Sequence, residues 1–187
     1  MRYYKLLLDE SVQDDIVCYC EDNLGFEQYH LNEGKFIYNW DGNLTFIFNP
    51  DEGARETDYL ANDLSWFIVS SNLKRLLQGL GNNEIQYLPV RVVNLRKKAL
   101  ITEYFVANVL GVIEALNLEN SDYGVIELDD EKVYSIRKYA LNQNVIRNHH
   151  IFKIKGFEIP TFVSEVFKDA VLKNEITGCD FLEVKTI

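Results

Sequence analysis

The chain of 187 residues is long enough for one domain with its own core, since 47% of its residues are hydrophobic. Eleven Tyr and eleven Phe favour a β-rich interior, because aromatic side chains fit the pleated surface of a sheet. No run approaches the roughly 20 apolar residues that cross a bilayer, and the opening MRYYKLLLDE meets an acid before an apolar run of signal-peptide length. We therefore expect a cytoplasmic protein without a membrane segment.

The net charge of −10 is concentrated in the first third of the chain. Residues 1–66 carry fourteen acidic and four basic side chains, whereas acids and bases balance in the remainder. Nucleic-acid binding depends on Lys and Arg that neutralise phosphates, so this charge argues against a nucleic-acid partner and favours a basic protein. The alternative is an acidic surface that serves only solubility.

The first third contains two predicted β features. MRYYKLLLD reads as an opening strand, and KFIYNWDGNLTFIF, residues 35–48, places Asp41-Gly42 between two β-type runs, which predicts a hairpin with a two-residue type I′ turn. Residues 49–63 combine Pro, Gly and acids without apolar periodicity and are predicted to be a linker. We expect an acidic, hairpin-containing region over residues 1–58 and an α+β domain over residues 59–187, packed as one compact unit.

One phrase occurs twice. IVSSNLKRLLQGLGNNEIQYLPV, residues 68–90, aligns without a gap with FVSEVFKDAVLKNEITGCDFLEV, residues 162–184, which lies 94 residues further on. Each copy predicts an amphipathic helix followed by a turn and a strand. Ser70 or Ser71 can cap the first helix and Ser164 the second. Pro89 places the first of these strands at a sheet edge or at a break in its ladder.

Between the two copies, TEYFVANVLGVIEALNL is predicted to begin as a strand and to become a helix at Asn108. Two further β-like runs follow, KVYSIRKYAL and HIFKIKGF. The expected fold is an α+β single domain with a mixed or antiparallel, β-rich sheet, two similar helix-turn-strand units and a central helix. In that helix the inward-facing residues would be Val109, Val112, Ile113 and Leu116.

Motifs for catalysis and for cofactor or metal binding are not found in the sequence. It has no phosphate-binding glycine loop and no GxSxG elbow, and the adjacent His149 and His150 would point to opposite faces of a strand. Cys18, Cys20 and Cys179 are too few for a disulfide framework and lack further ligands at zinc spacing, so we expect free thiols. We predict no catalytic residue, no metal and no cofactor, although a triad assembled from distant segments stays open.

Three segments together resemble a known family: ANDLSWFIVSSNLKRLLQGL with IQYLPVRVV, then YFVANVLGVIEAL, and then KGFEIPTFVSEVFKDAVLKNEITGCDFLEV. They are similar to immunity family eleven of bacterial polymorphic toxin systems, over residues 59–187. The resemblance implies a cytoplasmic antidote that binds a cognate toxin domain and blocks it sterically. It transfers no catalytic residue to this chain.

The resemblance and the charge together suggest where a basic toxin would bind. The hypothesised contacts are the acids of the first third and two aromatic anchors: Asp9, Glu10, Asp14, Asp15, Glu21, Asp22, Asp51, Glu52, Tyr29 and Tyr59. Two alternatives remain. An enzyme would have a deep pocket lined by His or paired acids, and a structural interaction module would expose an apolar patch or an edge strand.

Overall fold

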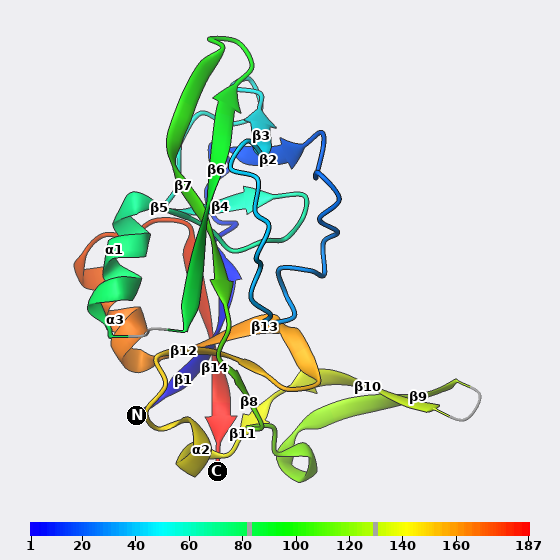
Figure 1. Cartoon of the computed structure of the whole chain (residues 1–187). Helices are drawn as coiled ribbons and strands as arrows, with labels where there is room; N and C mark the ends of the chain where they lie inside the picture. Colours follow the sequence, from blue (N-terminus) through cyan, green and yellow to red (C-terminus); the bar gives the residue numbers. More distant parts are fainter. Residues whose placement is uncertain (82–83, 129–130) are drawn as a thin grey trace.

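The computed structural model describes residues 1–81, 84–128 and 131–187, and most of its described strands belong to two six-stranded sheets (Figure 1). The first sheet closes into a barrel with the order β2-β3-β6-β7-β5-β4. Its strands are β2 (Val17–Cys20), β3 (Thr45–Phe48), β4 (Tyr59–Asn62), β5 (Ile68–Ser70), β6 (Ile85–Asn94) and β7 (Ala99–Val109). The β-rich α+β fold class predicted from the sequence is confirmed.

The second sheet has the order β11-β14-β1-β13-β12-β8. An antiparallel bridge between Leu116 and Leu141 joins its two ends, so this sheet also turns back on itself. Its strands are β1 (Tyr3–Leu8), β8 (Val112–Ile113), β11 (Ala140–Leu141), β12 (Ile151–Ile154), β13 (Phe157–Ser164) and β14 (Cys179–Thr186).

The two sheets repeat one another strand for strand. β7 pairs with β5 and β6 in the first sheet, as β1 pairs with β13 and β14 in the second. The registers agree, because Val69 lies opposite Phe105 and Val163, its counterpart in the second phrase, lies opposite Tyr4. The parallel pairs β2–β4 and β3–β6 likewise correspond to β8–β12 and β11–β14.

The repeat divides the chain into two consecutive halves, and the first strand of each half lies in the sheet of the other half. β1 opens the first half but lies between β13 and β14, whereas β7 opens the second half but lies between β5 and β6. A central strand satisfies backbone hydrogen bonds on both of its edges. Each sheet therefore depends on a strand from the other half of the chain.

The repeated phrases form the helices that cover the junction between the sheets. The side chain of Ser70 accepts hydrogen bonds from the first free amides of α1, and Ser164 does the same for α3. The capping prediction is confirmed, with Ser70 rather than Ser71 as the first cap. The helices are α1 (Ser71–Gly79), α2 (Gln143–Ile146) and α3 (Glu165–Lys173), with a 3-10 turn at Leu118–Asn120.

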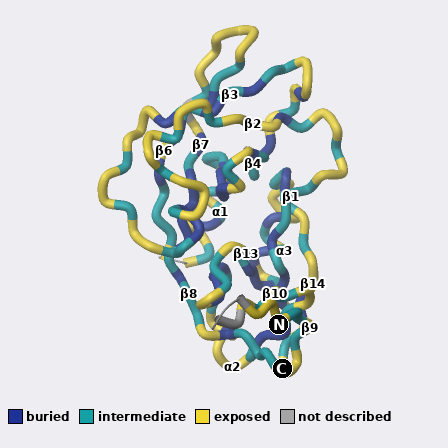
Figure 2. Tube along the Cα trace, turned by 90° about the vertical axis from the view of Figure 1, so that its right-hand side faces the viewer, coloured by how far each residue is buried: buried dark blue, intermediate teal, exposed yellow. Residues whose placement is uncertain are grey.

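The two phrases share one hydrophobic core. Leu73 and Leu77 of α1 and Phe167 and Val171 of α3 are fully buried in the same cluster, which also receives residues from both sheets. Figure 2 shows the buried positions along the strands and helices of the body, with exposed positions concentrated in the loops. The repeated phrase therefore serves as scaffold.

A cation–π contact also recurs in the two halves. The ammonium of Lys74 lies 3.5 Å from the centre of the Phe105 ring, and that of Lys168 lies 4.3 Å from the centre of the Tyr4 ring. Lys168 follows Lys74 by 94 residues, and Tyr4 holds the register position of Phe105. The halves thus agree in side-chain packing as well as in topology.

The predicted central helix is wrong. β7 continues through Asn108 to Val109, and β8 follows at Val112–Ile113. Asn108 does not cap a helix; its buried side chain donates to the carbonyl of Lys35 at 2.8 Å. The β-branched residues of this segment favour a strand, and burial on both faces of the strand hides the period-two pattern.

The predicted hairpin at residues 35–48 is only partly correct. The predicted type I′ turn does not form, because neither Asp41 nor Gly42 has a positive φ; a turn closes one residue later, where the amide of Leu44 donates to the carbonyl of Asp41 at 3.2 Å. Moreover, β3 pairs with β2 and β6, and residues 35–40 are not a strand. Trp40 packs instead against Phe26, with ring centres 5.0 Å apart. The predicted linker likewise includes β4, so it is wrong over Tyr59–Asn62.

Shared burial predicts that the halves unfold together. Leu73→Ala and Phe167→Ala should each lower the free energy of unfolding by about 2–5 kcal/mol, since each leaves a cavity in a packed core. Both tryptophans lie in the first half. Phe167→Ala, in the second half, should therefore shift the tryptophan-fluorescence melting curve as far as the far-UV circular dichroism curve.

The matched control is Leu172→Ala, because Leu172 lies on the same helix as Phe167 and is 62% exposed. It should change the stability by less than about 0.5 kcal/mol. A fluorescence transition that stays in place in Phe167→Ala would show that the two halves unfold independently.

Candidate functional site

Three of the predicted contact residues meet at one groove. Asp9 and Glu10 follow β1, and Tyr59 begins β4; all three line a cavity of about 740 Å³. Asp180 of β14 lines the same cavity, and Lys5 is the basic residue among its lining side chains. The groove lies where β1 and β13 part, because their pairing ends at Lys5–Phe162 while β1 still pairs with β14 as far as Leu8.

Two further predicted acids support the loop that precedes β2. Asp15 forms an ion pair with Arg55, with Oδ2 2.9 Å from Nη2. The main-chain carbonyl of Asp14 accepts hydrogen bonds from the amides of Ala54 and Arg55, at 2.9 and 2.8 Å. This pair of residues therefore contributes to the fold, and the charge of Asp15 is largely balanced.

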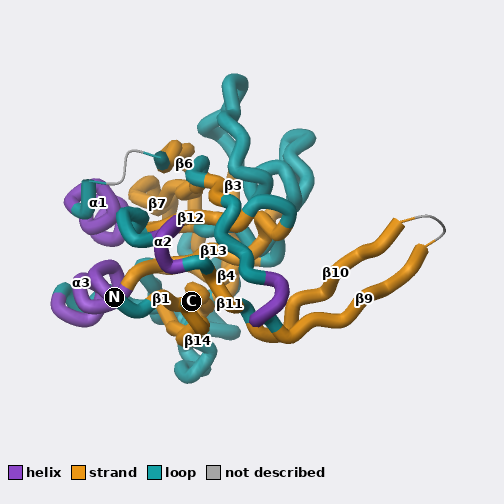
Figure 3. Tube along the Cα trace, turned by 90° about the horizontal axis from the view of Figure 1, so that it is seen from below, coloured by secondary structure: helices purple, strands orange, loops and turns teal. Residues whose placement is uncertain are grey.

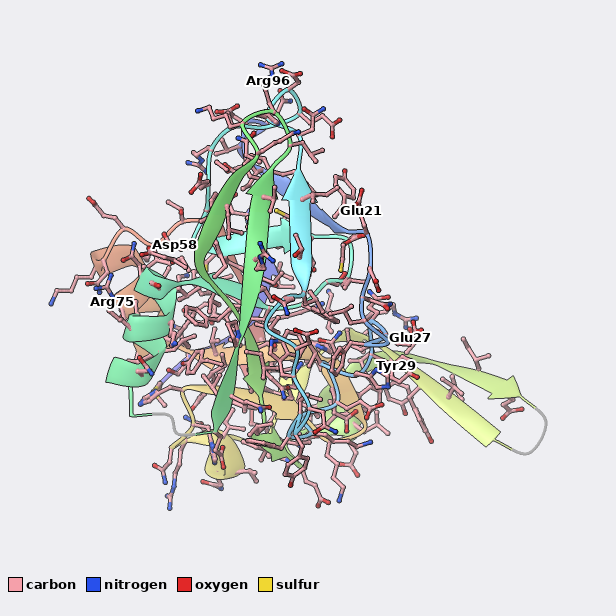
Figure 4. All side chains as sticks on the ribbon, turned by 45° about the horizontal axis from the view of Figure 1, so that its top comes forward. Glu21, Glu27, Tyr29, Asp58, Arg75 and Arg96 are labelled. Atoms are coloured by element: carbon pink, nitrogen blue, oxygen red, sulfur yellow. The ribbon has the colours of Figure 1, made fainter. Side chains whose placement is uncertain are left out.

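The remaining predicted acids lie in two separate regions. Asp51 pairs with Arg96, which stands at one end of the molecule, whereas Glu21 lies on the flank (Figure 4). Glu52 accepts a hydrogen bond from Asn49 at 3.0 Å in the turn after β3. The carboxylate of Asp22, beside Glu21, accepts a hydrogen bond from the amide of Leu24 at 2.9 Å, at the start of the long β2–β3 loop. The structure therefore does not gather all eight acids onto one site.

The two predicted aromatic anchors differ. Tyr29 is 55% exposed and contacts His30 with the rings tilted to one another and their centres 4.4 Å apart. Tyr59 is partly buried, lies edge-on to Phe67 at 4.9 Å between ring centres, and has a pKa raised by burial. Tyr29 is thus free to meet a partner, while Tyr59 offers only one edge to the groove.

Histidine and cysteine side chains occupy structural positions. Nδ1 of His150 lies 2.9 Å from Oγ of Ser164, the cap of α3, and His149 lies 4.0 Å from Glu84. Burial raises the pKa of the Cys18 thiol to about 12 and that of Cys179 to about 12, which disfavours the reactive thiolate. Over the residues that the structure describes, no cluster of His, Cys, Asp and Glu is suited to a metal ion.

One buried ionisable group is unusual. Lys153 is 3% exposed, and its ammonium donates to the carbonyl of Glu158 at 2.7 Å. Burial lowers the pKa of Lys153 to about 8. The side chain does not line any of the grooves described in this chain, so its perturbed pKa does not by itself indicate catalysis.

Comparison with protein families identifies the chain. The model of the immunity protein family Imm11 matches residues 2–186. The chain belongs to this family. The match extends the resemblance seen at residues 59–187 through the acidic first third and β1. No curated protein matches the sequence.

The chain carries an arm of which the sequence predicted only the second strand, within KVYSIRKYAL. β9 (Asp122–Leu128) and β10 (Glu131–Lys138) form a hairpin that projects from the body (Figure 3). Its exposed apolar side chains include Val125 at 46%, Ile126 at 53% and Val133 at 44%. Two β-type runs on either side of the acidic stretch ELDDE were the signal in the sequence. Among the described helices, none is long and apolar enough to cross a membrane.

The burial of Lys153 gives a pH-dependent prediction. Its folded-state pKa of about 8 lies below the usual 10.5, so the unfolded chain binds more protons between these values. The destabilisation caused by burying the charged Lys153 side chain is therefore fully present below about pH 8 and disappears as the pH rises toward 10.5. Lys153→Met should stabilise the protein at pH 7 by about 1–2 kcal/mol, after subtraction of the lost hydrogen bond to Glu158.

The measurement is chemical denaturation of both proteins between pH 7 and pH 10, with the difference in unfolding free energy plotted against pH. That difference should narrow as the pH rises. A constant difference would mean that Lys153 keeps an ordinary pKa in the folded protein.

Proposed function

We propose that this immunity protein binds a cognate toxin domain in the cytoplasm and neutralises it by steric blocking, without catalysis. The observation that carries the proposal is the family match over residues 2–186. The arrangement of chemical groups is compatible with it: carboxylates and apolar side chains line the exposed grooves, and where a hydroxyl donates to a carboxylate there, at Ser70 and Asp58, the same Ser70 side chain caps α1. The toxin would belong to a polymorphic toxin system.

The partner surface of the toxin is proposed to be basic. Glu10 and Glu21 are exposed, and neither has a hydrogen-bond or ion-pair partner among the described residues. Asp15 and Asp51, by contrast, already pair with arginines. Free carboxylates speed association with a positively charged surface and favour the correct orientation. A basic surface is also what a nuclease toxin would present to nucleic acid.

Within the predicted set, the structure favours the acids that are not engaged in the fold. These residues and the exposed aromatic ring are Asp9, Glu10, Glu21, Asp22 and Tyr29. The carboxylates of Asp9 and Asp22 accept local hydrogen bonds, from the amides of the residues two positions later, at 2.9 Å each. The contact set proposed for the toxin is thus smaller than charge alone suggested.

A charge-reversal pair tests this function. Glu10→Lys combined with Glu21→Lys should slow association with the cognate toxin domain by about tenfold or more at low salt, because steering by charge raises on-rates by 10–1000-fold. The free energy of unfolding should stay within about 0.5 kcal/mol of wild type, since the side chains are exposed. Surface plasmon resonance at several salt concentrations measures the rate.

The matched control reverses two exposed acids outside the first third, Glu119→Lys and Asp169→Lys. It changes the net charge by the same amount. If Glu10 and Glu21 form part of a specific acidic face, the control should therefore lose much less of the association rate. Equal losses in the two double variants would reduce the effect to net charge alone. Unchanged rates in both would remove the acidic face from the proposal.

A further inference from the structure

The duplicated fold lets one half be used as a template for the other. In the first half, β3 pairs with β6 only from Arg91 to Asn94, so the preceding residues of β6 have a free edge. An extended segment, residues 35–40, covers that edge. The side chain of Gln86 accepts a hydrogen bond from the amide of Ile37 at 2.9 Å and donates to its carbonyl at 2.7 Å.

Two further contacts hold the same segment. Asn108 of β7 donates to the carbonyl of Lys35 at 2.8 Å, and Nε1 of Trp40 donates to the carbonyl of Pro89 at 2.8 Å. These contacts cover the core at this edge, and Leu88 of β6 is accordingly only 4% exposed.

The second half has the same edge without the cover. β11 pairs with β14 only at Lys185 and Thr186, so the preceding residues of β14 correspond to the free edge of β6. Leu182 is the counterpart of Leu88, 94 residues further on, and it is 55% exposed. Asp180 takes the place of Gln86, and Leu7, which pairs with Asp180, takes the place of Asn108.

Two cavities lie along this uncovered edge of β14, which we call the track. The 740 Å³ groove reaches Leu7 and Asp180, and a second cavity of about 570 Å³ is lined by Leu182 and Glu183 beside the base of β10. Lys5 lines both. The two hollows therefore follow β14 over the same stretch that residues 35–40 cover on β6.

The different paths of two equivalent connections explain why one edge is covered. The β2–β3 connection, residues 21–44, folds back along β6 in the first half. The equivalent β8–β11 connection, residues 114–139, leaves the body as the β9–β10 hairpin (Figure 3). The second half thus lacks its own cover, and its track is open to a segment from another molecule.

We propose that the edge of β14, at Asp180, Leu182 and Glu183, binds an extended segment of the cognate toxin; this rests on the proposed function. Strand addition at a free edge supplies main-chain hydrogen bonds, and side-chain sites beside it supply specificity. Leu182 selects an apolar residue in the middle of the segment. At one end, the groove is lined by the carboxylates of Asp9, Glu10 and Asp180 and by one lysine, Lys5, so the excess of negative charge selects Lys or Arg there.

The test measures binding of the cognate toxin domain by isothermal titration calorimetry. Leu182→Arg should weaken binding by about 30-fold or more, because it removes an apolar contact at the centre of the track and places a charge there. Leu172→Arg is the matched control, since Leu172 is an equally accessible leucine at 62% exposure, located on α3. It should bind within about threefold of wild type, as expected for a residue outside the contact.

Hydrogen–deuterium exchange of the wild-type complex gives a second readout that needs no variant. The amides of residues 180–184 should exchange more slowly in the complex than in the free protein. Tight binding by Leu182→Arg together with unchanged exchange in β14 would overturn the β14 proposal and leave the immunity function intact. Failure of the wild-type protein to bind the toxin domain would instead contradict the proposed function, and the β14 proposal with it.

Discussion

Strand exchange between the two halves is the constraint on which this structure depends. β1 completes the sheet of the second half, and β7 completes that of the first, so each sheet contains one interior strand from the other half. The helices of both halves then bury their apolar faces in one cluster. A chain joined in this way resists local separation of its halves, which suits the proposed role of holding a fixed surface against a toxin.

The same duplication separates scaffold from recognition. Strand order, register, helix caps and the lysine–aromatic contacts agree between the halves, whereas the two long connections differ in course and composition. One connection is acidic and aromatic and folds over β6, and the other forms the projecting arm. Divergence at equivalent positions is expected where the scaffold is kept and the partner surface changes. The open edge of β14 is the outcome of that difference. It extends from the base of the arm to the groove that is lined by Asp9, Glu10 and Asp180.

Much of the scaffold could be predicted from the sequence, because it depends on local signals. The serine caps, the apolar stripe of each helix and the glycine before the last strand stand close together in the chain, and the two copies of the phrase support each other. The segment after Tyr104 could not be predicted in this way. It is a strand because it pairs with β6 on one edge and with the more distant β5 on the other, and the periodicity of the segment itself contains no information about these pairings.

The candidate site was predictable only in part. Composition located the acids, but their partners in the fold, such as Arg55 for Asp15 and Arg96 for Asp51, are 40 and 45 residues away in the sequence. The edge of β14 was hidden for the same reason. Leu182 reads as a core residue beside Leu88, and only the path of the β8–β11 connection leaves it exposed.

The central claim is that the protein neutralises its toxin by occupying it, and a titration of toxin activity tests this directly. A fixed amount of the toxin domain is mixed with increasing amounts of the immunity protein, and the residual toxin activity is measured at equilibrium. Blocking by occupation predicts a linear loss of activity that ends near one immunity protein per toxin. Complete silencing by a small fraction of that amount, increasing with incubation time, would show turnover and would contradict the account.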